Sequence, residues 1–184
     1  MKKLLFLSLS MSLLFSCKEA EKAEPEVVTE VIVEKATTEP VVNYPYPTTL
    51  ASDLKMGNPQ NTVKVMEMYK ILEAGVSVDS LLLPYLADSV TSVAFDLRKF
   101  HGSGKDFAER VKNFRAQFKT LNEEIITFAA LRSDSADLDL VSIWFKERVV
   151  RNNGKPDSTF YQENWRFNKD GKIYYRTAFA RYSF

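Results

Sequence analysis

The sequence has very little cysteine and histidine and no excess of charge of either sign. Of its 184 residues one is Cys and one is His, and 25 basic residues balance 24 acidic ones. One Cys cannot form an intramolecular disulfide, and one Cys with one His cannot supply the four ligands of a structural zinc site. A net charge of +1 also argues against the basic surface that nucleic-acid binding requires. We therefore expect no disulfide, metal, cofactor or nucleic-acid partner.

The first residues of the chain are typical of a secretory signal that ends at the single cysteine. Lys2 and Lys3 precede the apolar stretch 4–15, which is shorter than the roughly 20 residues needed to span a bilayer. Leu14-Phe15-Ser16-Cys17 resembles a bacterial lipobox, in which cleavage occurs before the cysteine and a diacylglycerol is attached to it. We predict that residues 1–16 are a lipoprotein signal peptide and that Cys17 is lipidated. The alternative is a conventional signal in which Cys17 has no role.

An acidic, Pro/Val-rich linker is expected next, over residues 17–47. Residues 18–47 hold seven Glu and three Lys, a net charge of −4, and show no helical or strand periodicity. This composition predicts a disordered, extended spacer. Its start, Lys18-Glu19-Ala20-Glu21, resembles the export tag of some Gram-negative surface lipoproteins, and it is equally typical of the beginning of a charged linker. We expect a lipid-anchored protein of the bacterial cell envelope, in the outer membrane, which the tag would place at the cell surface.

The ordered domain is expected over residues 48–184, with helices first and strands last. Capping residues and helical spacing of apolar side chains predict helices at 58–75, at 79–88 and from 102 onward, the third carrying Phe107, Val111, Phe114 and Phe118 on one face. β-Branched and aromatic residues predict strands at 89–95, 124–132, 139–151, 158–168 and 172–182. Asn-Asn-Gly and Asn-Lys-Asp-Gly join the last three as hairpins. This order predicts an α+β fold with helices packed on one face of a curved antiparallel sheet.

The order of the segments also resembles that of a known superfamily. A long helix, a short helix leading into Tyr85-Leu86-Ala87-Asp88-Ser89-Val90, and a closing hairpin over 163–173 follow one another as in SnoaL-like, nuclear transport factor 2-like domains. The resemblance covers about residues 58–182. It implies a cone-shaped sheet that wraps the helices and leaves a cavity at its wide end. Members use this cavity differently, so the resemblance implies no particular reaction.

Alternation along the strand 158–168 gives candidates for the lining of such a cavity. Tyr161, Glu163 and Trp165 share one face of the strand. An aromatic lining without a complete acid–base set favours a non-catalytic domain that binds a small, largely apolar ligand. The residues predicted to bind it are Tyr69, Arg115, Trp144, Tyr161, Glu163 and Trp165. A Glu163 next to Arg115 or Arg166 would form a structural ion pair rather than act as an acid.

An enzyme of the isomerase, dehydratase or hydrolase kind is the alternative. Resemblance to the ketosteroid isomerases of the superfamily gives Glu163 the place of their oxyanion-binding acid and Tyr69 that of their oxyanion-binding tyrosine. The place of their general base falls on Val93, which cannot accept a proton. Asp96 or His101 would have to serve instead. An Asp at the end of a strand is more typical of a turn, and a His before a helix is more typical of capping or a hydrogen bond at the pocket edge.

Two further features have structural interpretations. The outer face of the sheet, with Phe160 and Tyr175, would be buried if the domain formed a homodimer or docked on a partner. Asp134, Asp137 and Asp139 resemble a calcium loop, but the glycine and the closing bidentate Glu of such a loop are missing. We expect these aspartates to belong to a solvated hairpin turn.

Overall fold

The computed structural model of the chain describes residues 50–182. The predicted signal peptide, the lipidation site at Cys17 and the linker over 17–47 lie outside the described residues. Within residues 50–182, no helix is both long and apolar enough to cross a membrane.

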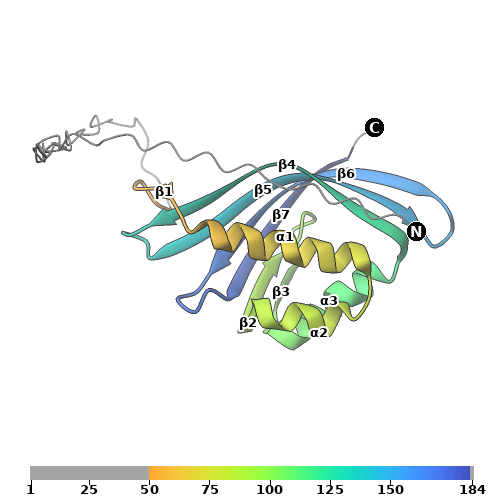
Figure 1. Ribbon diagram of the computed structural model, residues 1–184, viewed down its shortest axis with the longest axis horizontal. Coiled ribbons are helices and arrows are strands. Elements are labelled where there is room, and N and C mark those ends of the chain that lie inside the picture. Colours follow the sequence, from red (N-terminus) through yellow and green to blue (C-terminus); the bar gives the residue numbers. More distant parts are fainter. Residues whose placement is uncertain (1–49, 183–184) are drawn as a thin grey trace, which may run out of the picture. The chain divides into compact units, whose positions relative to one another are not determined.

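Helices precede most of the strands along the chain, as the sequence predicts (Figure 1). The helices are α1 (Pro59–Ala74), α2 (Val78–Leu82), which continues into a turn of 3₁₀ helix (Leu83–Tyr85), and α3 (Gly104–Arg115). The strands are β1 (Lys55–Met56), β2 (Leu86–Val93), β3 (Lys99–Ser103), β4 (Phe118–Ser133), β5 (Leu138–Arg151), β6 (Pro156–Phe167) and β7 (Ile173–Tyr182).

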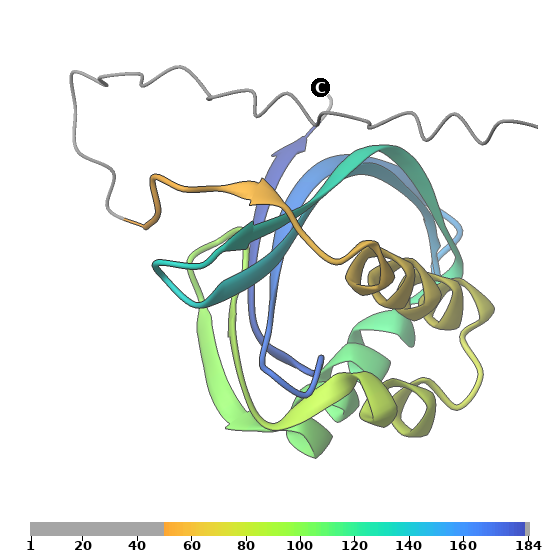
Figure 2. The ribbon, with the colours of Figure 1, turned by 60° about the vertical axis from the view of Figure 1, so that its left-hand side comes forward.

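The seven strands of the described region form a single curved sheet in the order β1-β4-β5-β6-β7-β2-β3. The long strands β4 to β7 follow one another as hairpins, and the sheet bends around the helices without closing (Figure 2). Register shifts in β4, between Phe118 and Thr120 and between Ile125 and Thr127, contribute to this curvature. The predicted α+β cone is confirmed. All neighbouring strands are antiparallel except β2 and β7, which are parallel, so the sheet is mixed.

The ends of α1 and the start of α3 follow from local sequence. The Asn58 side chain accepts a hydrogen bond from the Gln60 N–H, and Pro59 occupies the first turn of α1. Gly75 ends α1 with a left-handed φ of 69°, which a glycine adopts without strain. A reciprocal capping box between Ser103 and Asp106 starts α3.

Three segments differ from the prediction, and one of them is β4, which begins at Phe118 and not at 124. The second helix was expected to reach residue 88, but α2 ends at Leu82 because Pro84 lacks the N–H that would continue the helix. Residues 86–88 belong to β2 instead. The short strand β3 was not predicted, since its sequence Lys-Phe-His-Gly-Ser has a single large apolar residue. Pairing with β2 at the edge of the sheet keeps it extended.

The hydrophobic core lies between the concave face of the sheet and the helices. α1 contributes Val65, Met68 and Tyr69, which pack with residues from the central strands, among them Ile143, Phe145 and Trp165. The predicted stripe on α3 is only partly buried. Phe107 is buried and Val111 is half-buried, whereas Phe114 is exposed and Phe118 belongs to β4. Part of the stripe therefore faces open space inside the cone.

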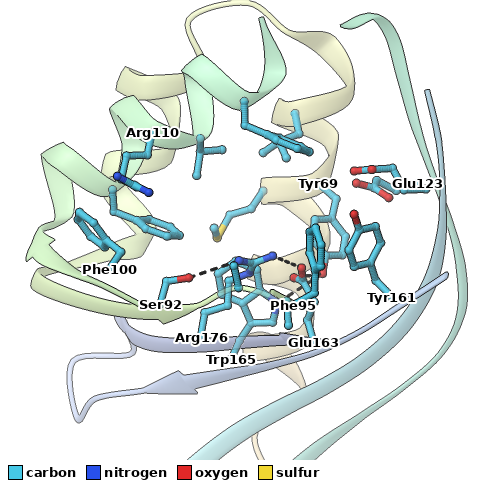
Figure 3. A pocket seen from close by; sticks show the side chains of 18 of the residues that line it. Tyr69, Ser92, Phe95, Phe100, Arg110, Glu123, Tyr161, Glu163, Trp165 and Arg176 are labelled. Atoms are coloured by element: carbon cyan, nitrogen blue, oxygen red, sulfur yellow. Dashed lines mark hydrogen bonds and ion pairs between the residues drawn. The ribbon is translucent and has the colours of Figure 1, made fainter. Parts of the chain in front are cut away.

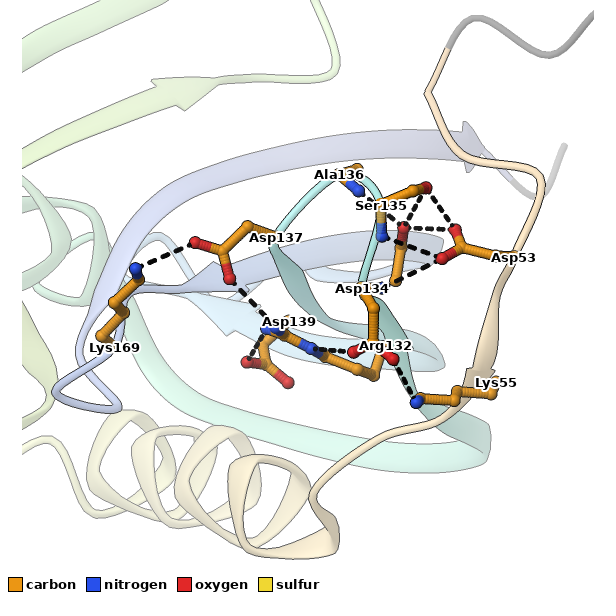
Figure 4. A network of polar contacts seen from close by, with 10 residues as sticks. Asp53, Lys55, Arg132, Asp134, Ser135, Ala136, Asp137, Asp139 and Lys169 are labelled. Atoms are coloured by element: carbon orange, nitrogen blue, oxygen red, sulfur yellow. Dashed lines mark hydrogen bonds and ion pairs between the residues drawn. The ribbon is translucent and has the colours of Figure 1, made fainter.

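The three aspartates of the β4–β5 turn all pair with one arginine (Figure 4). Arg132 donates to Asp134 at 3.2 Å, to Asp137 at 3.0 Å and to Asp139 at 2.8 Å. Asp53, from the segment before β1, accepts hydrogen bonds from the Ser133 and Ser135 hydroxyls and the backbone N–H groups of residues 134 and 135. The cluster thus ties β1 to the hairpin as a turn network, which agrees with the sequence-based expectation.

Candidate functional site

A cavity of about 550 Å³ lies between the concave face of the sheet and the helices α1 and α3. Its wall also includes the hairpin between β2 and β3. Aromatic side chains dominate the lining, namely Tyr69, Phe95, Phe100, Phe107, Phe114, Phe145, Tyr161 and Trp165. Several of them contact one another: the Phe145 ring stacks on Tyr161 with 5.3 Å between centroids and lies 4.9 Å from that of Tyr69.

Four of the predicted pocket residues line this cavity. Tyr161, Glu163 and Trp165 do so because alternate residues of β6 point to the concave face, and Tyr69 does so from the buried face of α1. That they bind a ligand stays a prediction.

Two other predicted pocket residues lie outside the cavity. Trp144 is between Ile143 and Phe145, whose side chains face the core, so it points to the opposite face of β5 and is 39% exposed. Arg115 ends α3 and donates to the backbone carbonyls of Leu72 at 2.6 Å and Phe118 at 2.7 Å. Arg115 therefore satisfies a carbonyl at the end of α1 and has a structural role.

Both candidates for a general base also lie outside the cavity. Asp96 is in the turn between β2 and β3, where its carboxylate accepts from the backbone N–H of Arg98 and pairs with the guanidinium of that residue. His101 is exposed on β3, with its Nδ1 2.9 Å from the Thr91 hydroxyl. The enzyme hypothesis built on Glu163 with Asp96 or His101 therefore lacks its base.

Glu163 belongs to a connected set of polar side chains, called here the Glu163 group: Tyr69, Glu163, Trp165 and Arg176 (Figure 3). The Tyr69 hydroxyl donates to Glu163 Oε2 at 2.9 Å, and Trp165 Nε1 donates to the Tyr69 oxygen at 3.3 Å. Arg176 forms an ion pair with Glu163 Oε1 and lies 5.2 Å from the centre of the Trp165 ring.

The partner of Glu163 is thus Arg176, not Arg115 or Arg166 as expected. Arg176 is opposite Trp165 in the β6–β7 register and so shares the concave face with Glu163. Arg166 points to the outer face, where its guanidinium lies 4.6 Å from the Tyr175 ring centre. An ion pair of Glu163 was predicted from the sequence, but its partner was not, because that partner depends on the β6–β7 register.

The electrostatics of the Glu163 group keep its protons in place. Burial, followed by the Glu163 carboxylate, raises the pKa of the Tyr69 hydroxyl well above its ordinary value. Burial on its own would lower the pKa of Arg176, but the Glu163 carboxylate outweighs this effect and the pKa is raised. Tyr69 therefore stays protonated with its proton directed at Glu163, and that proton is not free for a substrate oxygen.

Two further acidic side chains face the cavity, Glu123 from β4 and Glu147 from β5. They are called here the carboxyl pair. They are directly opposite each other in the β4–β5 register and are 9% and 8% exposed. Glu123 Oε2 is buried without any hydrogen-bond donor. Sequence reasoning missed this pair, although alternation would have found Glu147, which lies between the inward-facing Phe145 and Val149.

The carboxyl pair is difficult to ionise. Burial, and then the neighbouring Glu147 and Glu163, raises the pKa of Glu123 to about 9. Burial and Glu163 raise the pKa of Glu147 to about 7. Since the two groups titrate as a coupled pair, it retains at least one proton at neutral pH. In the described part of the chain, no group of three His, Cys, Asp or Glu side chains is placed to hold a metal ion.

Comparisons with known proteins agree on the fold. No protein-family model matches the sequence, and no curated protein matches it. Among solved structures, an NTF2-like protein of unknown function from Exiguobacterium sp. 255-15 is similar with a TM-score of 0.53 and 15% identity, over 64% of this chain and 98% of that one. AusH from Aspergillus nidulans has a TM-score of 0.54 and 11% identity, over 69% and 87% of the two chains.

A third similar structure contains a small molecule. It is a hypothetical protein with a ketosteroid isomerase-like fold from Catenulispora acidiphila, solved in complex with trimethylamine, with a TM-score of 0.51 and 14% identity over 65% of this chain and 85% of that one. These likenesses show that the described domain has the NTF2-like, ketosteroid isomerase-like fold.

Replacing Arg176 tests whether the Glu163 group is structural. Arg176→Met leaves Glu163 largely buried without its ion partner, so we expect the free energy of unfolding to fall by about 3 kcal/mol or more in urea denaturation. The double variant Glu163→Gln/Arg176→Met should recover part of this loss because no unpaired charge remains. Arg166→Met, on the outer face, serves as the control and should cost about 1 kcal/mol or less. An Arg176→Met protein as stable as the wild type would contradict the structural role.

The carboxyl pair predicts an unusual dependence of stability on pH. The native-state pKa values of Glu123 and Glu147 lie above the unfolded value, so between about pH 5 and pH 9 the native state binds more protons and stability falls as pH rises. Glu123→Gln removes part of this effect. In urea denaturation we expect the variant to be more stable than the wild type by at least about 1 kcal/mol at pH 9, and similar to it at pH 5. Glu124→Gln, exposed on the same strand, is the control and should show the same fall of stability with pH as the wild type. If the stability of Glu123→Gln and that of the wild type fell in parallel with pH, the raised pKa of Glu123 would be refuted.

Proposed function

We propose that the chain is a membrane-anchored envelope lipoprotein whose cavity binds a small, largely apolar molecule without converting it. The observation that carries this proposal is an aromatic-lined cavity in which the Glu163 group is already paired internally. A volume of about 550 Å³ falls in the range of sites for small molecules, and aromatic walls supply most of the contact area in such sites.

The arrangement of polar groups supports binding over catalysis. Stabilising a developing oxyanion requires donors that are free to point at the substrate. Tyr69 directs its donor at Glu163, and Arg176 directs one terminal N–H group at Glu163 and another at Ser92, while its Nε is unpaired within the described residues. Asp96 and His101 lie outside the cavity. A similar fold from Catenulispora acidiphila holds trimethylamine, which supports the view that such a cone accommodates a small ligand.

An enzyme is the second candidate, and the carboxyl pair is the observation that favours it. A Glu147 carboxyl with a pKa of about 7 is suited to transfer a proton at neutral pH. This version replaces Asp96 and His101 by Glu123 and Glu147. It differs from the binding proposal in one measurable respect, because the bound molecule would then be altered on incubation with the protein.

Attachment to the envelope and contact with partners are parts of the proposal that rest on other features. Anchoring rests on Cys17, the single cysteine, at the end of a signal-like stretch that resembles a lipobox. A homodimeric or partner-docking role rests on the outer face of the sheet, where Trp144 and Phe160 are each 39% exposed and Phe179 is 56% exposed.

Filling the cavity tests the binding proposal. We expect native mass spectrometry of the full chain, purified gently from its host, to show an added mass that Val111→Trp removes, because Val111 lines the cavity and an indole there would occupy the ligand's space. Val63→Trp, on the exposed side of α1, should retain the ligand. Release of the molecule chemically unchanged after incubation supports binding, and release of an altered product supports the enzyme. A wild-type cavity that is consistently empty would overturn the proposal.

Removing the predicted lipid site tests the anchoring. With Cys17→Ser we expect the chain to move from the membrane fraction to the soluble fraction, since each buried acyl CH₂ contributes about 0.8 kcal/mol of membrane affinity. Intact mass of the wild type should include the lipid. Ser16→Ala, next to the cysteine, is the matched control and should leave the chain in the membrane fraction. Equal fractionation of Cys17→Ser and wild type would show that Cys17 is not the anchor.

A further inference from the structure

We propose that the carboxyl pair recognises a ligand's ammonium group, so that the molecule held in the cavity is a small hydrophobic amine. This inference rests on the proposed ligand-binding function and names the chemical class of the ligand. Its starting point is the buried oxygen Oε2 of Glu123, which has no donor within the described structure.

An unpaired buried oxygen points to a partner that the described residues do not themselves supply. Buried polar atoms in folded proteins nearly always have a hydrogen-bond partner, and leaving one unpaired is costly. Glu123 is only 9% exposed, lines the cavity and lies opposite Glu147 on the neighbouring strand. Two carboxyl groups side by side provide several acceptor positions, which match the multiple N–H donors of a protonated amine.

Aromatic rings border the carboxyl pair on the same face of the sheet. Phe145 is two residues before Glu147 on β5, and its ring stacks on Tyr161 of β6 at an interplanar angle of 20°. Tyr161 is opposite Phe145 in the β5–β6 register and lines the same cavity as Glu123 (Figure 3). Aromatic faces attract cations, and they also accommodate the apolar carbon atoms attached to the nitrogen. The surroundings therefore fit a hydrophobic cation.

The charges around the pair are mainly negative. Glu163 faces it from β6, and Glu73 of α1 accepts a hydrogen bond from the Glu123 backbone N–H at 2.7 Å while pairing with the exposed Lys70. The cation that faces the pair is Arg176, which is in an ion pair with Glu163. Asp157 and Arg151, which pair with each other, are also near Glu147. The other ionisable groups on the cavity wall are Tyr69, Tyr161, Arg98 and Arg110. Arg110 lies over the Phe100 ring, and Arg98 pairs with Asp96.

Proton exchange distinguishes an amine from a neutral ligand. Because the empty pair retains a proton near neutral pH, binding an ammonium group should displace it, and affinity should rise with pH from 6 to 8.5. A simple alkylamine, like Lys, keeps its charge up to about pH 10, so the ligand's own titration does not interfere. A carbonyl ligand would instead need the protonated carboxyl as donor, and its affinity would fall over the same range. An alcohol carries its own O–H donor and lacks the charge that displaces the proton, so its affinity should not rise with pH.

The experiment compares two probes of equal shape. Isothermal titration calorimetry of the full chain with 2-phenylethylammonium chloride and with 2-phenylethanol, between pH 6 and 8.5, should show the amine binding at least about tenfold more tightly at pH 8. Its affinity should rise with pH, and its heat should depend on the buffer because protons are released. Glu123→Gln and Glu147→Gln should each weaken amine binding about tenfold and leave alcohol binding within about twofold. Glu124→Gln, exposed and paired with Arg148, is the control.

The outcomes separate this inference from the function on which it rests. Circular dichroism confirms that each variant is folded, and the two Gln variants give independent readings. Three outcomes would overturn the amine assignment while the cavity's binding function stands. They are equal binding of the two probes, an amine affinity that neither Gln variant changes, and a native ligand without a basic nitrogen. Failure of both probes together with an empty native cavity would overturn both.

Discussion

The ion pair between Glu163 and Arg176 is the interaction on which the interior of the cone depends. It joins β6 to β7, and through Tyr69 it also joins the sheet to α1. A largely buried ion pair is favourable only when further hydrogen bonds satisfy its remaining atoms. Here the Tyr69 hydroxyl donates to Glu163, and Arg176 also donates to the Ser92 hydroxyl on β2 at 3.4 Å. Three strands and one helix are thus oriented around one carboxylate.

This ion pair also determines the chemistry of the rest of the cavity. Because Arg176 is engaged by Glu163, its charge only partly offsets that of Glu123 and Glu147. Burial therefore dominates, and the pKa values of both carboxyl groups rise. The same pairing uses the proton of Tyr69 and one terminal N–H group of Arg176, while Glu123 Oε2 remains an acceptor without a partner within the described residues. An interior of this kind suits a ligand that brings its own donors.

The sequence predicted what depends on local pattern and missed what depends on long-range register. Asn58 and Gly75 correctly predicted the ends of α1, and alternation placed Glu163 on the concave face. To predict that Arg176 is the partner of Glu163 requires the β6–β7 register, which no local pattern encodes. Trp144 was wrongly predicted to line the cavity, because its position between the inward-facing Ile143 and Phe145 directs it to the opposite face of β5. Arg115 was misplaced because the end of α1 comes close to it only in the folded chain.

The NTF2-like cone does not define a reaction, since its sheet and helices supply only an enclosed space. What the space can do depends on which of its polar groups remain unpaired. In this chain the Glu163 carboxylate is paired with Tyr69 and Arg176, whereas Glu123 Oε2 and Arg176 Nε have no hydrogen-bond partner within the described residues. A catalytic carboxyl pair would need a second partner to stabilise the charge it creates. The cavity wall supplies aromatic rings, Glu163 and three arginines, of which Arg176 faces the pair. The unpaired Glu123 oxygen and the aromatic rings beside it fit the positive charge that the proposed amine would bring, and the proposal of recognition over catalysis rests on this fit.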